Sequence, residues 1–270
     1  MVLPALDIFF ILGCLASVLV GVVLGMLGGG GSILSIPILV YLFGIEPVLA
    51  SAYSLFIVGV TSLVGAVPKY RQQLVNLRTG LVFGLPSILA IFLTRSVVVP
   101  AIPDIVLSVD GWHLTKRMLV LGVFAILMLL ASVPLIRGRQ DLESNSQRFR
   151  YFLLMVEGIL IGFLTGLVGG GGGFLIIPAL VFLTGLKFKT AVGTSLLIIA
   201  VNSLLGFLGD LVNGTHHIQW AFLLLVAALA VGGIFLGNTW AKQVSPIRLK
   251  KAFGWLTLVM GLYILSKEIF

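Results

Sequence analysis

Long apolar stretches separated by short polar connections run along the chain and set its architecture. A helix needs about 20 apolar residues to cross a bilayer, at a rise of about 1.5 Å per residue. Most of the stretches have about that length, whereas 33–43 and 174–184 are too short to cross alone. The stretches are 6–27, 33–43, 50–67, 77–95, 114–136, 151–168, 174–184, 190–209, 218–240 and 248–266. This pattern predicts an all-α polytopic membrane protein with about 8–10 membrane segments.

Each short stretch follows a run of glycines, and the two runs belong to a motif that occurs twice. Residues 25–37 read GMLGGGGSILSIP and residues 166–178 read GLVGGGGGFLIIP, an offset of 141 residues (166 less 25). The match continues at that offset, so that Ser54 aligns with Ser195. The chain is therefore predicted to contain two copies of one unit. The first copy covers 1–136, a linker covers 137–150, and the second copy covers 151–270.

The glycine runs interrupt the apolar pattern at matching places of the two copies. Backbone that leaves a helix inside a membrane is tolerated where it is buried in protein or lines a polar cavity. Each short stretch forms either an unequal crossing pair with the segment before it or a hairpin that dips in and returns, and periodicity leaves both arrangements open. In secondary transporters, broken segments at corresponding positions of two repeats mark the substrate site.

The basic residues are concentrated in a few connections, which orients the chain in the membrane. Most of the 17 Lys and Arg residues lie within 69–78, 137–150, 187–189 and 242–251. The positive-inside rule places such connections in the cytoplasm, so both termini are expected on the outer side of the cell (inner) membrane. Corresponding connections of the two copies then fall on opposite sides, which predicts inverted repeats. Lys116 and Arg117 lie on the outer side, against the rule.

Composition agrees with a membrane protein and argues against other classes. The chain is 59% hydrophobic and 10% charged, with a mean hydropathy of +1.20, whereas soluble domains carry about 25% charged residues. The net charge of +8 lies in short connections, so no nucleic-acid partner is expected. A single cysteine, Cys14, excludes an internal disulfide and a cysteine metal cluster. No cofactor is expected, and His216 and His217 lack the further ligands that a metal site needs.

Enzyme chemistry finds no support in the motifs. No Lys-Ser/Thr pair follows the glycine runs, as a phosphate-binding loop requires. Asp210 has no second carboxylate at its depth to form an aspartyl protease site, and we expect it to be solvated at an outer helix end. No base lies in the membrane near Ser195 or Ser203 to activate a serine nucleophile. The chain is therefore not expected to be an enzyme.

Candidate substrate-binding residues come from the glycine runs and from polar faces of the flanking spans. Residues seven apart lie two turns apart on one helix face, as do Ser54 with Thr61 and Ser195 with Asn202. The alternative reading is that small and polar residues let membrane helices approach and hydrogen-bond. The candidates are Gly28, Gly29, Gly30, Gly31, Ser32, Tyr53, Ser54, Thr61, Gly169, Gly170, Gly171, Gly172, Gly173, Thr194, Ser195 and Asn202.

Such a site favours an anion held by backbone groups. No basic residue is expected near the middle of a span, because Arg95 and Lys69 lie at span ends. Consecutive glycine N–H groups and helix N-termini can bind an anion without a basic side chain. Ser32 is expected either to cap the helix that follows it or to donate to the ligand. A small oxyanion fits this chemistry, and a neutral polar solute is an alternative.

Glu157 is the acidic residue that lies well inside a span. It follows Tyr151 by six residues, which places it about 9 Å into the helix. An intramembrane carboxylate is a candidate proton relay, so coupling to protons is one hypothesis for this chain. The alternative is a structural carboxylate that pairs with Arg150 or with a backbone donor.

The inverted repeat favours a secondary transporter that works by alternating access, with a passive anion channel as the alternative. The segments GMLGGGGSILSIPIL, GLVGGGGGFLIIPAL and AVGTSLLIIAVNSLLGFLGD resemble the sulfite exporter TauE/SafE family of mainly bacterial membrane proteins. The resemblance covers nearly the whole chain. It implies transport of sulfur oxyanions or organosulfonates, such as sulfite or sulfoacetate, across the lipid bilayer. The direction of transport is left open, and so is the choice between a monomer and a homodimer.

Overall fold

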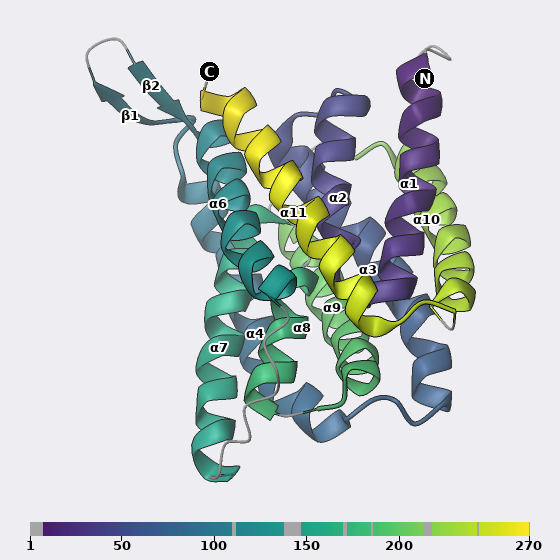
Figure 1. The fold of residues 1–270 in the computed structure, drawn as a ribbon. Coiled ribbons are helices and arrows are strands. Elements are labelled where there is room, and N and C mark those ends of the chain that lie inside the picture. The colour runs from purple at the N-terminus through teal and green to yellow at the C-terminus, as the bar shows by residue number, and fades with distance from the viewer. Residues whose placement is uncertain are drawn as a thin grey trace.

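Helices make up nearly all of the chain in the computed structural model, which describes residues 8–109, 112–137, 147–169, 172–184, 186–212, 218–241 and 243–269 (Figure 1). Residues 8–137 contain α1 (Ile8–Leu27), α2 (Ser32–Pro37), the π-helical η1 (Ile38–Leu42), α3 (Pro47–Arg71), α4 (Leu77–Leu93), the π-helical η2 (Thr94–Val98), α5 (Val99–Ala101) and α6 (Lys116–Arg137). Residues 147–269 contain α7 (Gln147–Val168), α8 (Gly173–Thr184), α9 (Phe188–Val212), α10 (Trp220–Trp240) and α11 (Pro246–Ile269). An antiparallel hairpin of β1 (Ile105–Val109) and β2 (Trp112–Thr115) precedes α6.

The prediction of an all-α polytopic membrane protein is confirmed. Among the described residues, 7 helices are long and apolar enough to cross a membrane, and two shorter apolar stretches cover Ser32–Leu42 and Gly254–Lys267. Their outward faces carry large apolar side chains, such as Ile8 at 70% exposure and Leu15 at 63%. Apolar surface on this scale is typical of a protein solvated by lipid.

The short segment after the first glycine run turns back inside the membrane. Phe43, which follows η1, packs edge-on against Phe10 with ring centroids 5.7 Å apart, and it also lies against Gly13. Since Phe10 and Gly13 belong to the first turns of α1, the path through α2 and η1 returns to the side from which α1 came. α8 returns beside α7 in the same way (Figure 1). The structure therefore favours the hairpin over the crossing pair.

Helices from the two halves of the chain pack against each other in pairs. α1 packs on α10 and α7 packs on α4, while α3 packs on α9 and α6 on α11. Gly21 brings α1 against the backbone of Ala230, and Gly162 brings α7 against the backbone of Ser87. Gly21 and Gly162 are equivalent at the offset of 141, so the same small residue permits the close backbone approach in both pairs.

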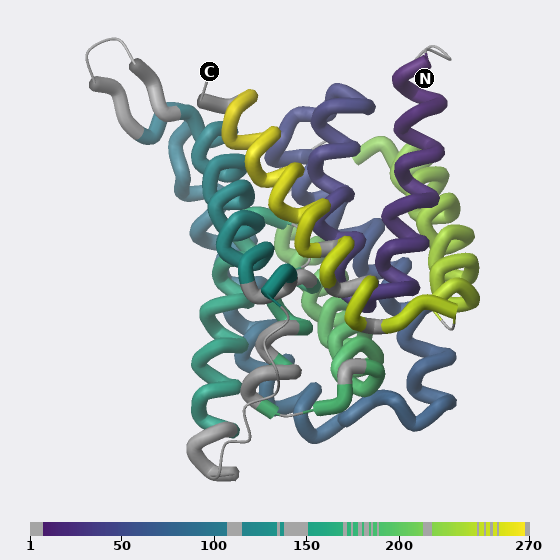
Figure 2. The backbone as a smooth tube through the Cα atoms, viewed as in Figure 1, coloured from purple at the N-terminus to yellow at the C-terminus, as the bar shows by residue number. Residues whose placement is uncertain are grey.

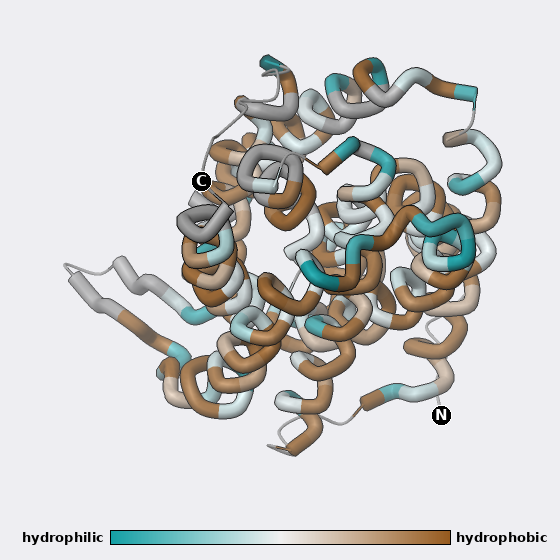
Figure 3. The backbone as a smooth tube through the Cα atoms, turned by 90° about the horizontal axis from the view of Figure 1, so that it is seen from below, coloured by the Kyte–Doolittle hydropathy of each residue, from teal (hydrophilic) through white to brown (hydrophobic). Residues whose placement is uncertain are grey.

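The two ends of the bundle differ in what they carry. We call the end where α1 begins and α11 ends the terminal end, and the opposite end the basic end (Figure 1). α7 begins at the basic end, so α1 and α7 run in opposite directions, as the smooth trace also shows (Figure 2). Seen from the basic end, hydrophilic stretches lie on the connections and apolar stretches on the surrounding helices (Figure 3). The connections at this end carry Lys69, Arg71, Arg78, Lys187, Lys189 and Arg248.

Candidate functional site

The two glycine runs meet inside the bundle. A Cβ atom on Gly29 would collide with the backbone of Gly173, and one on Gly173 would lie 2.7 Å from the Cα of Gly29. The backbones of the two runs are therefore in direct contact, although the sequence separates them by more than half of the chain. Only glycine leaves room for such an approach.

Matching glycines in the two runs adopt the same special conformation. Gly28 has a φ of +77° and Gly169 a φ of +83°, in the left-handed region that glycine adopts without strain. Gly28 rests on Val192 near the start of α9, and Gly169 rests on Ser51 near the start of α3. Ser51 and Val192 are themselves equivalent at the offset of 141. Each run thus rests on a helix from the other half of the chain.

Several predicted site hydroxyls make bonds within the protein. Ser32 donates to the carbonyl oxygen of Gly29 at 2.8 Å and is fully buried. The expectation that Ser32 caps the next helix is wrong, because α2 begins at Ser32 itself and Gly31 takes the cap position without a side-chain bond. Ser54 shares a short hydrogen bond with Ser35 and so fastens α3 to α2. Ser195 donates to the backbone oxygen of Val192 at 2.9 Å.

Tyr53 and Thr194 hold the starts of two other helices. The Tyr53 hydroxyl accepts from the backbone N–H of Gln219 at 2.7 Å, just before α10. Thr194 accepts from the backbone N–H of Asn76 at 2.9 Å, just before α4. The two residues are equivalent at the offset of 141 and fasten equivalent helix starts. In this structure their hydroxyls are engaged at these helix starts.

Four polar atoms near the crossing of α3 and α9 are buried without a hydrogen-bond partner among the described residues. They are the hydroxyls of Thr61, Ser62 and Ser203 and the amide oxygen of Asn202. Thr61 is equivalent to Asn202, and Ser62 to Ser203. The amide nitrogen of Asn202 donates to the hydroxyl of Ser87 on α4 at 2.6 Å. Buried polar atoms are nearly always bonded, so a set of exceptions at matching positions calls for an explanation such as a ligand.

Arg95 lies beside the second glycine run, which the sequence reasoning missed. The expectations that Arg95 lies at a span end and that Asp210 is simply solvated are both wrong. Arg95 is 1% exposed, and its Nη1 atom donates to the Ser51 hydroxyl at 3.0 Å and to the Asp210 carboxylate at 3.2 Å. Its side chain also lies against Gly169. The signal in the sequence was the apolar run that continues past Arg95, where η2 and α5 extend α4 to Ala101.

Glu157 is half-buried on α7. Its Oε2 atom is buried and has no hydrogen-bond partner among the residues that the structure describes. The side chain of Arg150, its suggested partner, lies outside the described part, as do Gly170, Gly171, His216 and His217. Within the described residues, no group of three or more His, Cys, Asp or Glu could hold a metal ion.

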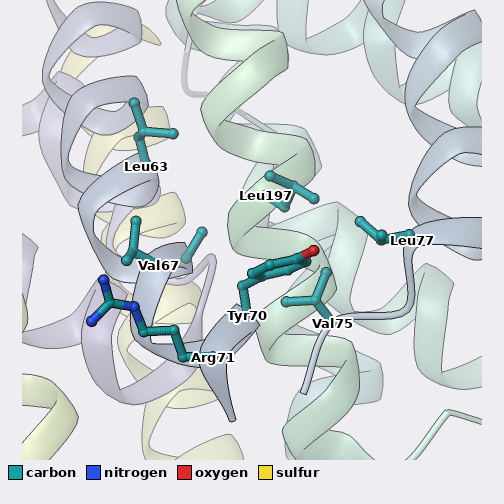
Figure 4. Close-up of a pocket in the computed structure, with 8 residues that line it drawn as sticks. Leu63, Val67, Tyr70, Arg71, Val75, Leu77 and Leu197 are labelled. Carbon is teal, nitrogen blue, oxygen red and sulfur yellow. The ribbon is translucent and has the colours of Figure 1, made fainter. Parts of the chain in front are cut away.

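An apolar cavity of about 270 Å³ lies at the basic end of α3, separate from the glycine runs (Figure 4). Its lining includes the buried Ala66, the half-buried Leu197 and the exposed Val67 and Tyr70. At the equivalent place near the terminal end, Phe207 replaces Ala66 and Phe56 replaces Leu197. There Phe56, Phe207 and Trp220 pack on one another with centroids 5.1 to 6.1 Å apart. The two ends of the bundle are therefore packed differently.

Comparison with known proteins agrees with this architecture. Residues 13–264 match the family model described as sulfite exporter TauE/SafE. A "probable membrane transporter protein" of Xylella fastidiosa (strain Temecula1) is 31% identical over 261 residues, which cover 93% of this chain and 92% of that protein.

Two further relatives carry the same kind of name. The "probable membrane transporter protein YdhB" of Bacillus subtilis is 28% identical over 92% of this chain and 96% of its own. A relative from Methanocaldococcus jannaschii is 26% identical, over 92% of this chain and 94% of its own. No solved structure matches the chain. The family match spans both glycine runs and nearly all the described helices, and the chain therefore belongs to the sulfite exporter TauE/SafE family and is a multi-pass membrane transporter, not an enzyme.

Proposed function

We propose that this transporter is a secondary carrier of small anions, in particular sulfur oxyanions or organosulfonates, across the cytoplasmic membrane. The observation that carries the proposal is the contact between Gly29 and Gly173, which joins the two glycine runs inside the bundle. Broken elements of two repeats that meet in the membrane interior are the usual setting of a transporter's substrate site.

The glycine runs and the flanking helices α3 and α9 offer hydrogen-bond donors, which suits an anion. Glycine backbone in the left-handed conformation can present consecutive N–H groups to one ligand. The hydroxyls of Thr61, Ser62 and Ser203 are buried without partners among the described residues and could donate to ligand oxygens. The family name points to sulfite, whose three oxygens accept such bonds. Together these features support an oxyanion over a neutral solute.

Alternating access is supported by the way in which the two copies are built into each other. In our proposal, 1–136 and 151–270 are inverted repeats joined by a cytoplasmic linker. Equivalent helices α1 and α7 run in opposite directions, and each glycine run is seated on a helix of the other copy. Rocking one copy against the other would then shift both glycine runs together with the helices on which they rest. It would expose the contact between the runs to one end of the bundle at a time.

Uptake into proteoliposomes tests the function and separates a carrier from a channel. The panel contains sulfite, thiosulfate, sulfate and short sulfonates, with glycerol as the neutral solute, each with and without a proton gradient. We expect saturable uptake of at least one sulfur anion, faster when the same anion is present on the far side. Uptake of glycerol alone would contradict the proposal, and anion flux without saturation or acceleration would indicate a channel.

The orientation gives a second prediction. The basic end is proposed to face the cytoplasm, because its connections carry Lys69, Arg71, Arg78, Lys187 and Lys189. Both termini then lie outside. Fusions of alkaline phosphatase to either terminus should be active, and fusions of a reporter that works only in the cytoplasm should be silent. The reverse pattern would overturn the orientation and the sidedness of every step above.

A further inference from the structure

The ion pair between Arg95 and Asp210 lies between the terminal end and the second glycine run. The Asp210 side chain is 11% exposed near the end of α9, whereas the Arg95 side chain behind it is fully buried. Arg95 in turn lies against Gly169, the first glycine of the second run. From the surface inward, the order is therefore carboxylate, guanidinium and glycine run.

This ion pair is buried, so desolvation of its two charges offsets much of their attraction. Taking two charges out of water costs several kcal/mol per ion, and the attraction between them often only offsets that cost. The two contacts from Nη1 to the Asp210 oxygens measure 3.2 and 3.4 Å. Charge-assisted bonds are usually about 2.7–2.9 Å long, so these two contacts are longer than an ideal bidentate pair. Ionisable residues kept inside membrane proteins commonly line a substrate path.

The cluster has no counterpart at the basic end, although the fold repeats there. The positions equivalent to Ser51, Arg95 and Asp210 at the offset of 141 are Val192, Leu236 and Lys69. Asp210 is thus matched by a residue of opposite charge, and Arg95 by an apolar one. A purely architectural role would be expected in both copies, whereas a role in receiving substrate from one side is needed once.

We propose that Arg95 is the first substrate-binding group on the path from the terminal end, and that Asp210 occupies it until a substrate anion takes its place. This inference rests on the proposed function and adds to it a residue and an order of events. An oxyanion with two oxygens on one centre, such as sulfite or a sulfonate, matches the planar fork of a guanidinium. The Ser51 hydroxyl, 3.0 Å from Nη1, keeps Arg95 in place while the anions exchange.

Replacement of the Asp210 carboxylate by a substrate anion at Arg95 also opens the path from the terminal end. Once displaced, the Asp210 carboxylate gains water at the end of α9, which compensates for the lost contact with the guanidinium. The anion bound at Arg95 then faces Gly169 and the run that follows. Because the anion binds the opened state and competes with Asp210 in the closed one, it shifts the population toward the opened state.

Variants of the pair test this through both anion binding and transport. Binding is read from the thermal stabilisation of purified protein by sulfite or methanesulfonate, with chloride as the comparison. Asp210→Asn removes the competing charge and should lower the half-saturating anion concentration about tenfold or more. Arg95→Gln should raise it by a similar factor. The double variant Arg95→Gln with Asp210→Asn removes both charges and so avoids an unpaired buried ion.

The double variant decides between a binding role and a structural one. A structural pair predicts that the double variant folds and both binds and transports as the wild type does, which would overturn the proposal. A binding role predicts that it folds but stays weak in anion binding, as Arg95→Gln is. Arg71→Gln removes an exposed arginine at the basic end and should change neither readout. If anions stabilise the protein through Arg95 but the protein transports no sulfur anion, the proposed function alone is refuted. If uptake is normal and Arg95→Gln leaves anion binding unchanged, this inference alone is refuted.

Discussion

Replacing Gly28 with alanine is expected to reduce substrate uptake to background, whereas the same change at Gly44 should leave uptake near the wild-type rate. Both glycines lie in the left-handed region, with φ of +77° and +67°. Alanine there costs about 1–2 kcal/mol in backbone strain at either position. A methyl group on Gly44 meets nothing within 4 Å, but one on Gly28 would lie 2.7 Å from Cγ1 and 2.9 Å from the carbonyl oxygen of Val192. The difference in uptake between the two variants therefore measures the importance of the contact between the first glycine run and α9.

The second run supplies an independent test of the same idea. In Gly169→Ala the new methyl group would lie 2.7 Å from the Cα of Ser51 and would also press on Arg95. We expect uptake to be lost there as well, while the amount of protein in the membrane, measured by immunoblot, stays within about twofold of the wild type because a strain of about 1–3 kcal/mol is local. Full uptake by both Gly28→Ala and Gly169→Ala would assign the runs to helix packing alone.

Replacing Glu157 with glutamine is expected to abolish proton-driven accumulation while sparing exchange of labelled for unlabelled substrate. Glutamine keeps the size and most of the hydrogen-bonding capacity of glutamate but cannot titrate. The buried Oε2 of Glu157 has no partner among the described residues, so its charge is not fixed by a neighbour that they include. Such a carboxylate can load and release a proton as the site turns from one side to the other.

Two controls make the Glu157 result specific. Asp104→Asn neutralises an exposed carboxylate before β1 and should leave accumulation unchanged. Exchange must be measured in the same vesicles as accumulation, because a misfolded variant would lose both. If Glu157→Gln accumulates substrate at the wild-type rate under a proton gradient, the relay hypothesis is wrong. The carboxylate would then be a structural feature of α7.

Most of the fold could be predicted from the hydrophobic periodicity and the internal repetition of the sequence. Hydropathy separates the long spans from the short stretches, because span length follows directly from bilayer thickness. The offset of 141 identified Gly28 and Gly169 as equivalents, and both adopt a positive φ in the structure. The choice of hairpin over crossing could not be made in advance. It depends on Phe43 meeting Phe10, a contact between side chains that lie more than 30 residues apart.

The sequence could not predict which neighbouring helix each polar face contacts. The spacing of Ser54 and Thr61 shows that they share a face, but not which helix that face meets. Tyr53 and Thr194 were expected near the ligand, and the structure engages them at the starts of α10 and α4. Arg95 was missed for a related reason. The predicted span ended at the charge of Arg95, although the apolar run continues to Ala101, where η2 and α5 extend the helix and Arg95 is buried.

The pairing of α1 with α10 has a consequence for how the chain is made. Gly21 finds its backbone partner at Ala230, about two hundred residues later, which is about 10–40 s of synthesis at cellular rates. During that interval the glycine-lined side of α1 has no protein neighbour from the second copy. Lipid or the insertion machinery must occupy it, since the first half cannot complete its own packing. Newly inserted protein thus passes through a stage in which the N-terminal half is complete in length but not in structure.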